Sequence, residues 1–385
     1  MNAIYDLIVI GGGISSCTLI SNVLKKGFKG KIAVVEVGRG LGGRSSTRFS
    51  NKDSNRIFNH GSPNFNITNI LGNTSLDIFI KDLIDKKFIK HIDNSFFNLD
   101  ENYKITRAVD NEFYKGKVYI PKKYMSEFVN NLIQQYNNEN QIDFYFETLI
   151  DHLDFRNNIW KISSKVKQII SGKFLVCSSN LLLHKRSLKI LNVDEIPLRK
   201  AILSSKNNKI DEILYLTNKQ SYVKRINFLI TTKHDFKLKG NFDNEIMHLI
   251  SSKRAEQKTG IERIVFQKHL DKRTGIVIHT KYKENAFNLN IQDNDYLNIY
   301  LLKILNKVLK KNLVTSNNLT FENISVMNWR ASQPLGRGIP ERLQVCNDYK
   351  IAFCGDWFQF EGFGRVQGAI LSGLNLSEKI IDSMI

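Results

Sequence analysis

The chain has 385 residues, of which 42% are hydrophobic and 24% charged, and its formal net charge is +19. A chain of this length can bury two moderate cores, and this composition is typical of a folded, water-soluble protein and excludes a disordered chain. No apolar run reaches the roughly 20 residues of a membrane-spanning helix, so we expect no transmembrane segment.

The basic residues are spread along the whole chain. Their densest stretch, from Lys303 to Lys311, lies in a predicted helix over about 295–311 that also carries an apolar stripe. We interpret this stretch as a solvated face above a core face. A positive field would still attract anionic substrates, above all those that carry phosphate. Nucleic-acid binding is a minor hypothesis.

The cysteines are scattered and have no metal-ligand spacing, so we predict no metal site. They are Cys17, Cys177, Cys346 and Cys354. Unpaired cysteines suit a reducing cytoplasm, which is the location we expect. The first six residues carry no positive side chain, so we do not interpret the apolar stretch before Cys17 as an export signal.

The first motif predicts a strand over 5–10, a glycine turn, a helix, a second strand and an acid. Gly11 permits the tight turn, and Gly13 lets the backbone approach a pyrophosphate without a Cβ in the way. The following helix start offers free N–H groups to phosphate oxygens. Ser16 stands where a third glycine is usual, a position that serves close helix packing. Glu36 ends the second strand, where an acid accepts hydrogen bonds from ribose hydroxyls. The order predicts a dinucleotide site.

A second glycine turn, Gly42-Gly43-Arg44, follows, and a loop over 59–63 contains His60. Residues from about 76 to 114 predict a mixed insertion of helix and strand. A helix is predicted from about Lys123 to Tyr136.

The next segments predict strands. Short strands are expected at 144–146 and 149–150, then an antiparallel meander over 151–170. The buried run 174–177 ends at Ser178-Ser179, where a parallel strand would meet a cofactor.

The stretch from Leu188 to about Thr315 is less regular and carries no recognisable catalytic motif, so we expect a substrate or cap domain. The glycine-rich pattern then returns. A strand over 350–354 leads to Gly355 and Asp356, and residues 362–369 open a final helix. The first and last segments therefore both predict cofactor binding, by a discontinuous domain.

These segments together resemble the glutathione-reductase-type flavoproteins, specifically the amine-oxidase-like branch and, within it, the renalase-like proteins. The N-terminal motif with Glu36 and the turn Gly42-Gly43-Arg44 are similar to the FAD signature of that branch. The renalase-like resemblance rests on 59–61, 329–334, 354–357, 364–366 and 372–373. The resemblance covers both ends and about 117–179, and the middle of the chain matches weakly.

The resemblance implies an α/β fold, with a Rossmann-like FAD-binding domain and an inserted mixed α+β substrate domain. We expect the FAD-binding domain over 1–75, 115–185 and 325–385, and the substrate or cap domain over 76–114 and 186–324. No cysteine occupies a flavin-linkage motif, so we expect non-covalent FAD.

The resemblance also implies roles along the cofactor. The first turn cradles the pyrophosphate, Glu36 binds the adenosine ribose, and Arg44 braces the phosphates or the flavin side of the turn. The backbone of Ile150 faces the adenine, and Asp356 accepts from a ribitol or phosphate-side hydroxyl. The helix start at 364–366 lies by the flavin pyrimidine edge, where its dipole stabilises reduced flavin. The full set expected at the cofactor is Gly11, Gly13, Ile14, Ser15, Ser16, Glu36, Val37, Gly42, Gly43, Arg44, Ile150, Gly355, Asp356, Gly364, Arg365 and Val366.

The chain also departs from this pattern near the expected flavin face. Asn59 stands where relatives usually carry an acid, and Ser62-Pro63 stands where they carry Ala-Gln. Residues 358–361 resemble a short insertion. These departures leave the choice of substrate open.

The chemistry needs no separate acid or base, because flavin N5 accepts the hydride itself. The candidate catalytic residues are His60 and Arg365, although a loop histidine is more often a packing or hydrogen-bonding residue. Arg365 would stabilise a reduced flavin anion, and a surface ion pair is its alternative. Trp357 and Phe363 would line the substrate pocket or pack in the core.

Three functions follow from the sequence. The first is an FAD-dependent oxidase that takes hydride from a small reduced substrate and passes electrons to oxygen. By the renalase-like resemblance, a dihydronicotinamide dinucleotide isomer is a candidate substrate. The second is an oxidase or desaturase of an amine or an apolar substrate. An apolar pocket with paired aromatic side chains over the flavin would favour this second function. The third is a non-enzymatic flavin-binding protein. The acceptor and the oligomeric state stay open.

Overall fold

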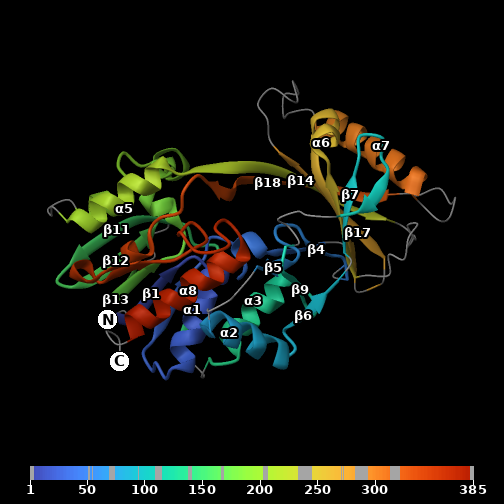
Figure 1. The fold of residues 1–385 in the computed structure, drawn as a ribbon. Helices are drawn as coiled ribbons and strands as arrows, with labels where there is room; N and C mark the ends of the chain where they lie inside the picture. The colour runs from blue at the N-terminus through green and yellow to red at the C-terminus, as the bar shows by residue number, and fades with distance from the viewer. Residues whose placement is uncertain are drawn as a thin grey trace.

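The computed structural model describes residues 4–381 except 51–52, 54, 69–73, 94, 109–114, 138–140, 166–168, 203–206, 233–244, 270, 272, 282–293 and 313–320. Two large sheets organise these residues, one in the cofactor-side body and one in the part that we call the cap (Figure 1). Among the described residues, no helix combines the length and apolarity needed to cross a membrane.

The first sheet has eight strands and contains both the first and the last strand of the described residues. Its strands are β1 Ile4–Ile10, β2 Ile32–Val35, β10 Ile142–Tyr145, β11 Ile150–Arg156, β12 Ile159–Ser164, β13 Ile169–Cys177, β19 Val345–Cys346 and β20 Ile351–Phe353. Strands β10, β2, β1 and β13 lie side by side in parallel. The C-terminal β20 pairs in parallel with β13, which places the last strand of the chain one strand away from the first.

Strand β13 has two different neighbours along one edge. Its first half pairs antiparallel with β12, at Trp160 opposite Gly172, and its second half pairs in parallel with β20 from Leu175 onward. The sequence predicted a meander that ends at 170 and a separate buried run at 174–177. That separation was wrong, because one strand covers Ile169–Cys177. A Cβ at Gly172 would lie 2.6 Å from the Ile8 side chain, so the glycine marks a close approach to β1 inside one strand.

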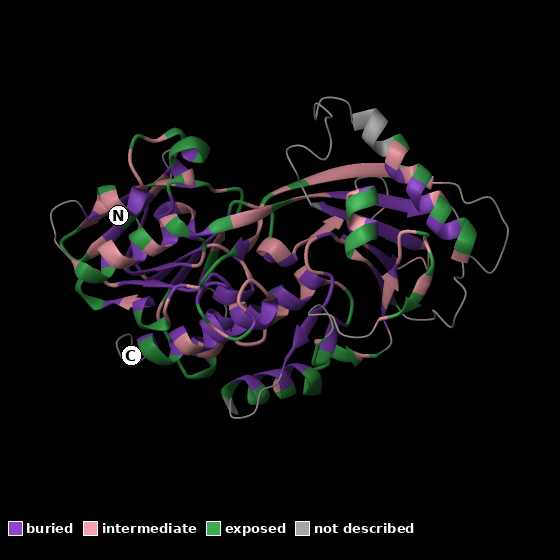
Figure 2. Ribbon diagram, turned by 45° about the horizontal axis from the view of Figure 1, so that its top comes forward, coloured by how far each residue is buried: buried purple, intermediate pink, exposed green. Residues whose placement is uncertain are grey.

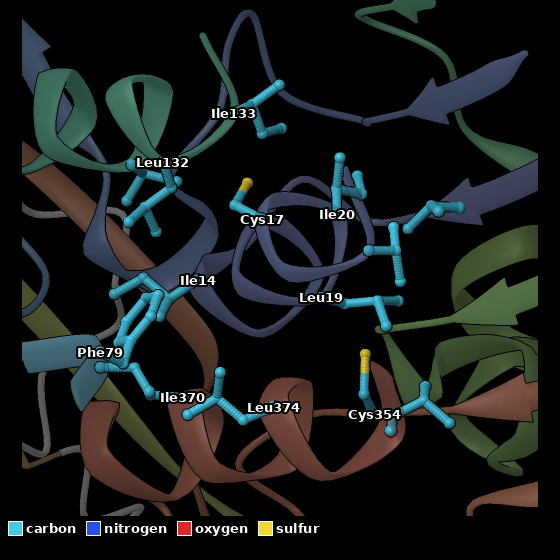
Figure 3. Packing of buried hydrophobic residues seen from close by; sticks show 14 of the residues in the cluster. Ile14, Cys17, Leu19, Ile20, Phe79, Leu132, Ile133, Cys354, Ile370 and Leu374 are labelled. Atoms are coloured by element: carbon cyan, nitrogen blue, oxygen red, sulfur yellow. The ribbon is translucent and has the colours of Figure 1, made fainter. Parts of the chain in front are cut away.

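Helices cover both faces of this sheet. They are α1 Ile14–Lys25, α2 Thr74–Asp85, α3 Met125–Gln134, α4 Pro197–Ala201, α5 Asn208–Lys219 and α8 Val366–Ile381. Helices α1, α2, α3 and α8 share one hydrophobic cluster, and Figure 3 shows Phe79 of α2 beside Ile370 of α8. Helices α4 and α5 pack with β11 and β13 on the opposite face.

The second sheet, which we call the cap sheet, has seven strands in the order β18-β14-β17-β16-β15-β7-β8. Its strands are β7 Phe96–Leu99, β8 Ile105–Arg107, β14 Ser221–Thr232, β15 Ile246–Ser251, β16 Ile261–Lys268, β17 Thr274–Lys281 and β18 Phe321–Leu335. Helix α7, Asn294–Asn312, packs its apolar side chains on one face, and α6, Lys253–Thr259, lies near β15 and β16.

The opposite face of the cap sheet, its inner face, is turned toward the cofactor-side body. Leu229, Val265 and Val277 of this face pack against Phe58 and Ile120 of that body. Figure 2 shows that the cap strands are largely buried while the helices expose their outer sides. Two smaller sheets lie between, formed by β3 Thr47–Phe49 with β4 Ile57–Asn59, and by β5 Phe65–Ile67, β9 Lys117–Pro121 and β6 Ile89–Ile92.

The predicted α/β architecture is confirmed, with one parallel sheet between helices and a separate, mainly antiparallel sheet. The predicted helices at 123–136 and 295–311 are α3 and α7. Lys303 and Lys307 of α7 are exposed while Ile304 and Val308 are buried, as a solvated face over a core requires.

The hydrophobic clusters indicate a smaller cap than the one that we expected from the sequence. We expected residues 76–114 and 186–324 in the cap, but α2, α4 and α5 contribute their buried side chains to the cores of the cofactor-side body. Among the described residues of the earlier segment, only β7 and β8 join the cap sheet. We propose that the cap consists of 96–107 and 221–335, a division that stays to be tested.

Candidate functional site

The first glycine turn leaves an open position above a helix start. Strand β1 ends at Ile10, and α1 begins at Ile14 with Gly13 as its N-cap and no acidic residue in its first turn. A Cβ added at Gly13 would meet no atom within 4 Å, whereas one at Gly12 would come 2.7 Å from Leu41. Free space at the positive end of a helix fits an anionic group such as a pyrophosphate.

The second glycine turn packs directly on the first. Gly42 N donates to Gly12 O at 2.8 Å, and a Cβ at Gly43 would lie 3.2 Å from the Cα of Gly13. Residues Gly43–Ser45 then form one short 3-10 helix, η1, which carries Arg44. Ser16 is fully buried and its hydroxyl donates to Gly13 O at 2.8 Å, so it packs where a third glycine is usual.

Glu36 is almost buried at the end of β2, where its carboxylate closes the first turn. Oε2 accepts from Gly12 N at 2.6 Å, and Oε1 accepts from Gly38 N at 2.7 Å. The backbone O of Glu36 accepts from Thr148 N, which holds the chain before Ile150 beside the acid. A carboxylate has about four acceptor positions, so two remain for further donors. Val37 is exposed next to it.

The two ends of the chain meet through an ion pair. Arg44 reaches across from the second turn, and its Nη1 donates to Asp356 Oδ2 at 2.7 Å, while Nη2 donates to Oδ1. Asp356 is buried after β20, and Gly355 N donates to the Ser372 hydroxyl of α8 at 3.0 Å. This pair joins residues 312 positions apart in the sequence.

The last helix begins beside the same pair. Gly364 N donates to Asp356 O at 2.8 Å, and α8 begins at Val366. Arg365 is half-buried immediately before the helix start, and its backbone O accepts from Ala369 N. The structure thus brings the predicted segments 11–16, 36–37, 42–44, 355–356 and 364–366, and the predicted Ile150, into one body.

His60 is buried at the border between this body and the cap sheet. Its ring stacks on Trp329 of β18, with 5.2 Å between ring centroids, and its Nε2 lies 3.2 Å from the Ser46 hydroxyl. Its Nδ1 has no partner. Burial, and then the charge of Arg48, lower the pKa of His60 to about 4, so the imidazole is neutral near pH 7.

The departures noted in the sequence have structural explanations. Asn59 Oδ1 accepts from the Thr47 hydroxyl and from Met125 N, so the amide ties β3 to the start of α3. Phe358 is fully buried in the core of the cofactor-side body, as is Trp357, whose Nε1 donates to Ser178 O. Trp357 therefore packs in the core and does not line the substrate pocket. Phe363, the other aromatic residue with these two alternatives, is half-buried.

A polar cluster on the inner face of the cap sheet was missed by the sequence reasoning. Arg225 of β14 forms a buried bidentate pair with Glu262 of β16, at 2.6 Å and 2.8 Å. Arg263 stands directly opposite His279, and His279 opposite Asn227, so these three share one face. His248 lies one row along on β15.

A signal for this cluster was present in the sequence. In β16 and β17, Arg263 and His279 occupy the same positions of the strand alternation as the buried Val265 and Val277. A polar residue at a core-facing position of a strand indicates a buried polar site.

Comparison with known proteins supports the fold. Residues 9–76 match the model of the NAD(P)-binding Rossmann-like domain. A putative protoporphyrinogen oxidase from Exiguobacterium sp. 255-15 has a similar structure, with a TM-score of 0.64 at 10% identity over 100% of both chains. Cyclohexylamine oxidase from Brevibacterium oxydans IH-35A is also similar, with a TM-score of 0.66 at 10% identity over 99% of both chains. No curated protein matches the sequence.

The chain shares the fold of these two oxidases over essentially its whole length. The predicted fold class is therefore confirmed. At 10% identity the similarity concerns the fold alone, and the renalase-like part of the resemblance stays a prediction.

Proposed function

We propose that this protein is an FAD-dependent oxidoreductase that binds FAD without a covalent link and oxidises a small substrate. The observation that carries the proposal is the meeting of both chain ends at Arg44 and Asp356. The glycine turns, the Rossmann-like match over 9–76 and the fold of the two oxidases support the same conclusion.

The described residues fit a dinucleotide. The open position at Gly13 and the free N–H groups of α1 suit the pyrophosphate, and Glu36 retains acceptor capacity for ribose hydroxyls. Asp356 and the start of α8 would face the flavin half. FAD supplies the hydride-accepting chemistry when it is bound, and the chain supplies position and electrostatics.

The chain's own groups limit the mechanism. His60 is neutral near pH 7 because its pKa is lowered to about 4, so we assign it a hydrogen-bonding role at the border of the two parts. The start of α8 and Arg365 place positive potential next to Asp356. We propose that this potential favours the reduced, anionic form of the bound cofactor.

The substrate class is the finer part of the proposal. We propose a small reduced substrate, with a dihydronicotinamide dinucleotide isomer as the first candidate and oxygen as the acceptor. An amine is the alternative, which the fold of cyclohexylamine oxidase supports equally. A non-enzymatic flavin-binding role is the third possibility.

The visible spectrum of the purified protein tests the cofactor. Flavin absorption in the blue and near-ultraviolet, released by denaturation, is expected. A folded protein that is colourless and takes up no added FAD would contradict the proposal. Anaerobic bleaching by dihydronicotinamide isomers or by cyclohexylamine then separates the two substrates, and bound flavin that no donor bleaches would indicate the non-enzymatic role.

A further inference from the structure

Five side chains around the inner face of the cap sheet carry buried polar atoms without a partner. These atoms are Nδ1 of His60, Oδ1 of Asn227, both ring nitrogens of His248, Nε2 of His279 and Nε1 of Trp329. His248 is fully buried, and Asn227 and His279 are each 1% exposed. An unsatisfied buried polar atom costs about 1–3 kcal/mol, so such a gathering indicates a ligand that the chain itself does not supply.

These groups form one continuous patch. Asn227, His279 and Arg263 stand in a row across β14, β17 and β16, and the amide of Asn227 donates to His60 O at 2.6 Å. His60 in turn stacks on Trp329. We call these residues, with His248, the inner-face patch.

The patch is continuous with the proposed cofactor site. A Cβ at Gly61, next to His60, would lie 2.0 Å from Arg44 O. On the other side, Arg225 donates to Ser332 and approaches Gln333, whose side chain lies 3.1 Å from the Cβ position of Gly364. A molecule on the patch would therefore sit between the cap sheet and the flavin half of the site.

Two guanidinium groups at the patch, those of Arg263 and Arg225, face the single carboxylate of Glu262, which pairs with Arg225, so positive charge is in excess among these three residues. The pKa of His279 lies well below its usual value because burial removes the ring from water and because Arg263 and Arg225 add positive charge. His248 has a lowered pKa for the same reasons, with Arg263 as the cation. Burial lowers the pKa of Arg263 to about 10, so it is still charged at neutral pH. Neutral imidazoles can donate an N–H, and the guanidinium gives charge.

We propose that the inner-face patch binds an anionic group of the substrate, a carboxylate or a phosphate, with Arg263 as its counter-ion and His279 and His248 as neutral hydrogen-bond donors. The inference rests on the proposed function in that it places this group beside the cofactor. It narrows the substrate from any small reduced molecule to one that carries a negative charge.

Binding of small model anions tests the proposal on the protein as purified. Thermal melting would be followed while benzoate, phenyl phosphate or the uncharged benzamide is added. Either anion should raise the melting temperature in a saturable way, and benzamide should bind at least tenfold more weakly. The anion that binds better identifies carboxylate or phosphate as the preferred group.

Variants identify the site. Arg263→Gln should weaken anion binding by about tenfold or more, the loss of one charge-assisted hydrogen bond, and Arg263→Lys should recover part of it. Arg254→Gln removes a cation of the cap that is 83% exposed and should leave binding unchanged. If Arg263→Gln fails to fold, His279→Asn is the second variant, with an expected loss of severalfold.

Two results would overturn the inference. The first is that benzamide binds as tightly as benzoate. The second is that neither Arg263→Gln nor His279→Asn weakens the binding of the anions. Its failure is distinguishable from that of the proposed function, because melting reports anions with or without flavin. A colourless protein with Arg263-dependent anion binding would reject the function and retain the patch.

Discussion

The cofactor turns and the inner-face patch are both buried and polar, but they are satisfied in different ways. At the turns, Glu36 accepts from two backbone amides and Arg44 pairs with Asp356, so the chain provides the partners. On the patch, His248 and His279 have ring nitrogens with none. The chain therefore satisfies its own polar groups at the turns, whereas polar atoms of the patch are left without a partner, as the proposed anion site requires.

The Arg225–Glu262 pair, which borders the patch, gives the largest expected effect. Glu262→Gln should lower the free energy of unfolding by about 3 kcal/mol, because it leaves the guanidinium buried opposite a neutral group. Chemical denaturation measures this loss. Glu212→Gln removes one partner of an exposed pair with Arg342, and because water screens this pair the free energy of unfolding should hardly change. Equal losses of unfolding free energy in both variants would contradict the prediction that the buried pair contributes more to stability than the exposed pair.

Acid should lower the free energy of unfolding through the buried histidines of the patch. A histidine whose folded pKa is lowered takes up its proton more readily in the unfolded chain, so stability is lost as pH falls from about 6.5 to about 4. For His60 alone the full loss is about 3 kcal/mol. Unfolding free energies between pH 7.5 and 5 would show the slope, and His60→Gln should flatten it. A stability that does not change over this range contradicts the lowered pKa.

The ion pair at the turns is expected to govern the cofactor. Asp356→Asn keeps the shape but weakens the bidentate pair with Arg44, and FAD affinity should fall by about tenfold to a hundredfold. Fluorescence titration of FAD into the apoprotein measures this change. Asp348→Asn, an exposed acid that bonds Asn207, is the matched control and should bind FAD normally. Unchanged affinity in Asp356→Asn would remove this residue from the site.

The smallest effect is expected where a polar group has no partner to lose. His248→Phe should not lower the free energy of unfolding, because the ring stacks on Phe96 at 4.6 Å and neither nitrogen has a bond to lose. His269→Phe is the contrast, since its Nδ1 accepts from Ile57 N at 3.1 Å and the loss should be about 1–2 kcal/mol. The same His248 variant should weaken benzoate binding. A large loss of stability would mean that the imidazole is structural.

The cofactor turns could be predicted from the sequence because each is a local pattern. Gly13 before a helix and Glu36 at a strand end have meaning within a few residues. The Arg44–Asp356 pair could not be predicted from spacing, because a 312-residue separation carries no geometric information. The family resemblance placed both residues at the cofactor but did not imply that they pair with each other.

The inner-face patch was not predictable in the same way. Its members come from β14, β15, β16, β17, β18 and the loop before β5, and their common face depends on strand order and register. The sequence showed where strands would form, but not which strand would lie beside which. Strand β13 shows the same limit, since Gly172 signals a break locally and a close contact in the fold.

The cap sheet is assembled from two separate excursions of the chain. Strands β7 and β8 leave the cofactor-side body early and pair with β15, with Phe96 opposite His248, while β14 and β18 enter at the other edge. A ribosome therefore releases one edge of the sheet long before the rest exists. The cap cannot be cloned as one contiguous piece, and inserting or deleting it in a relative would take two coordinated changes in the gene.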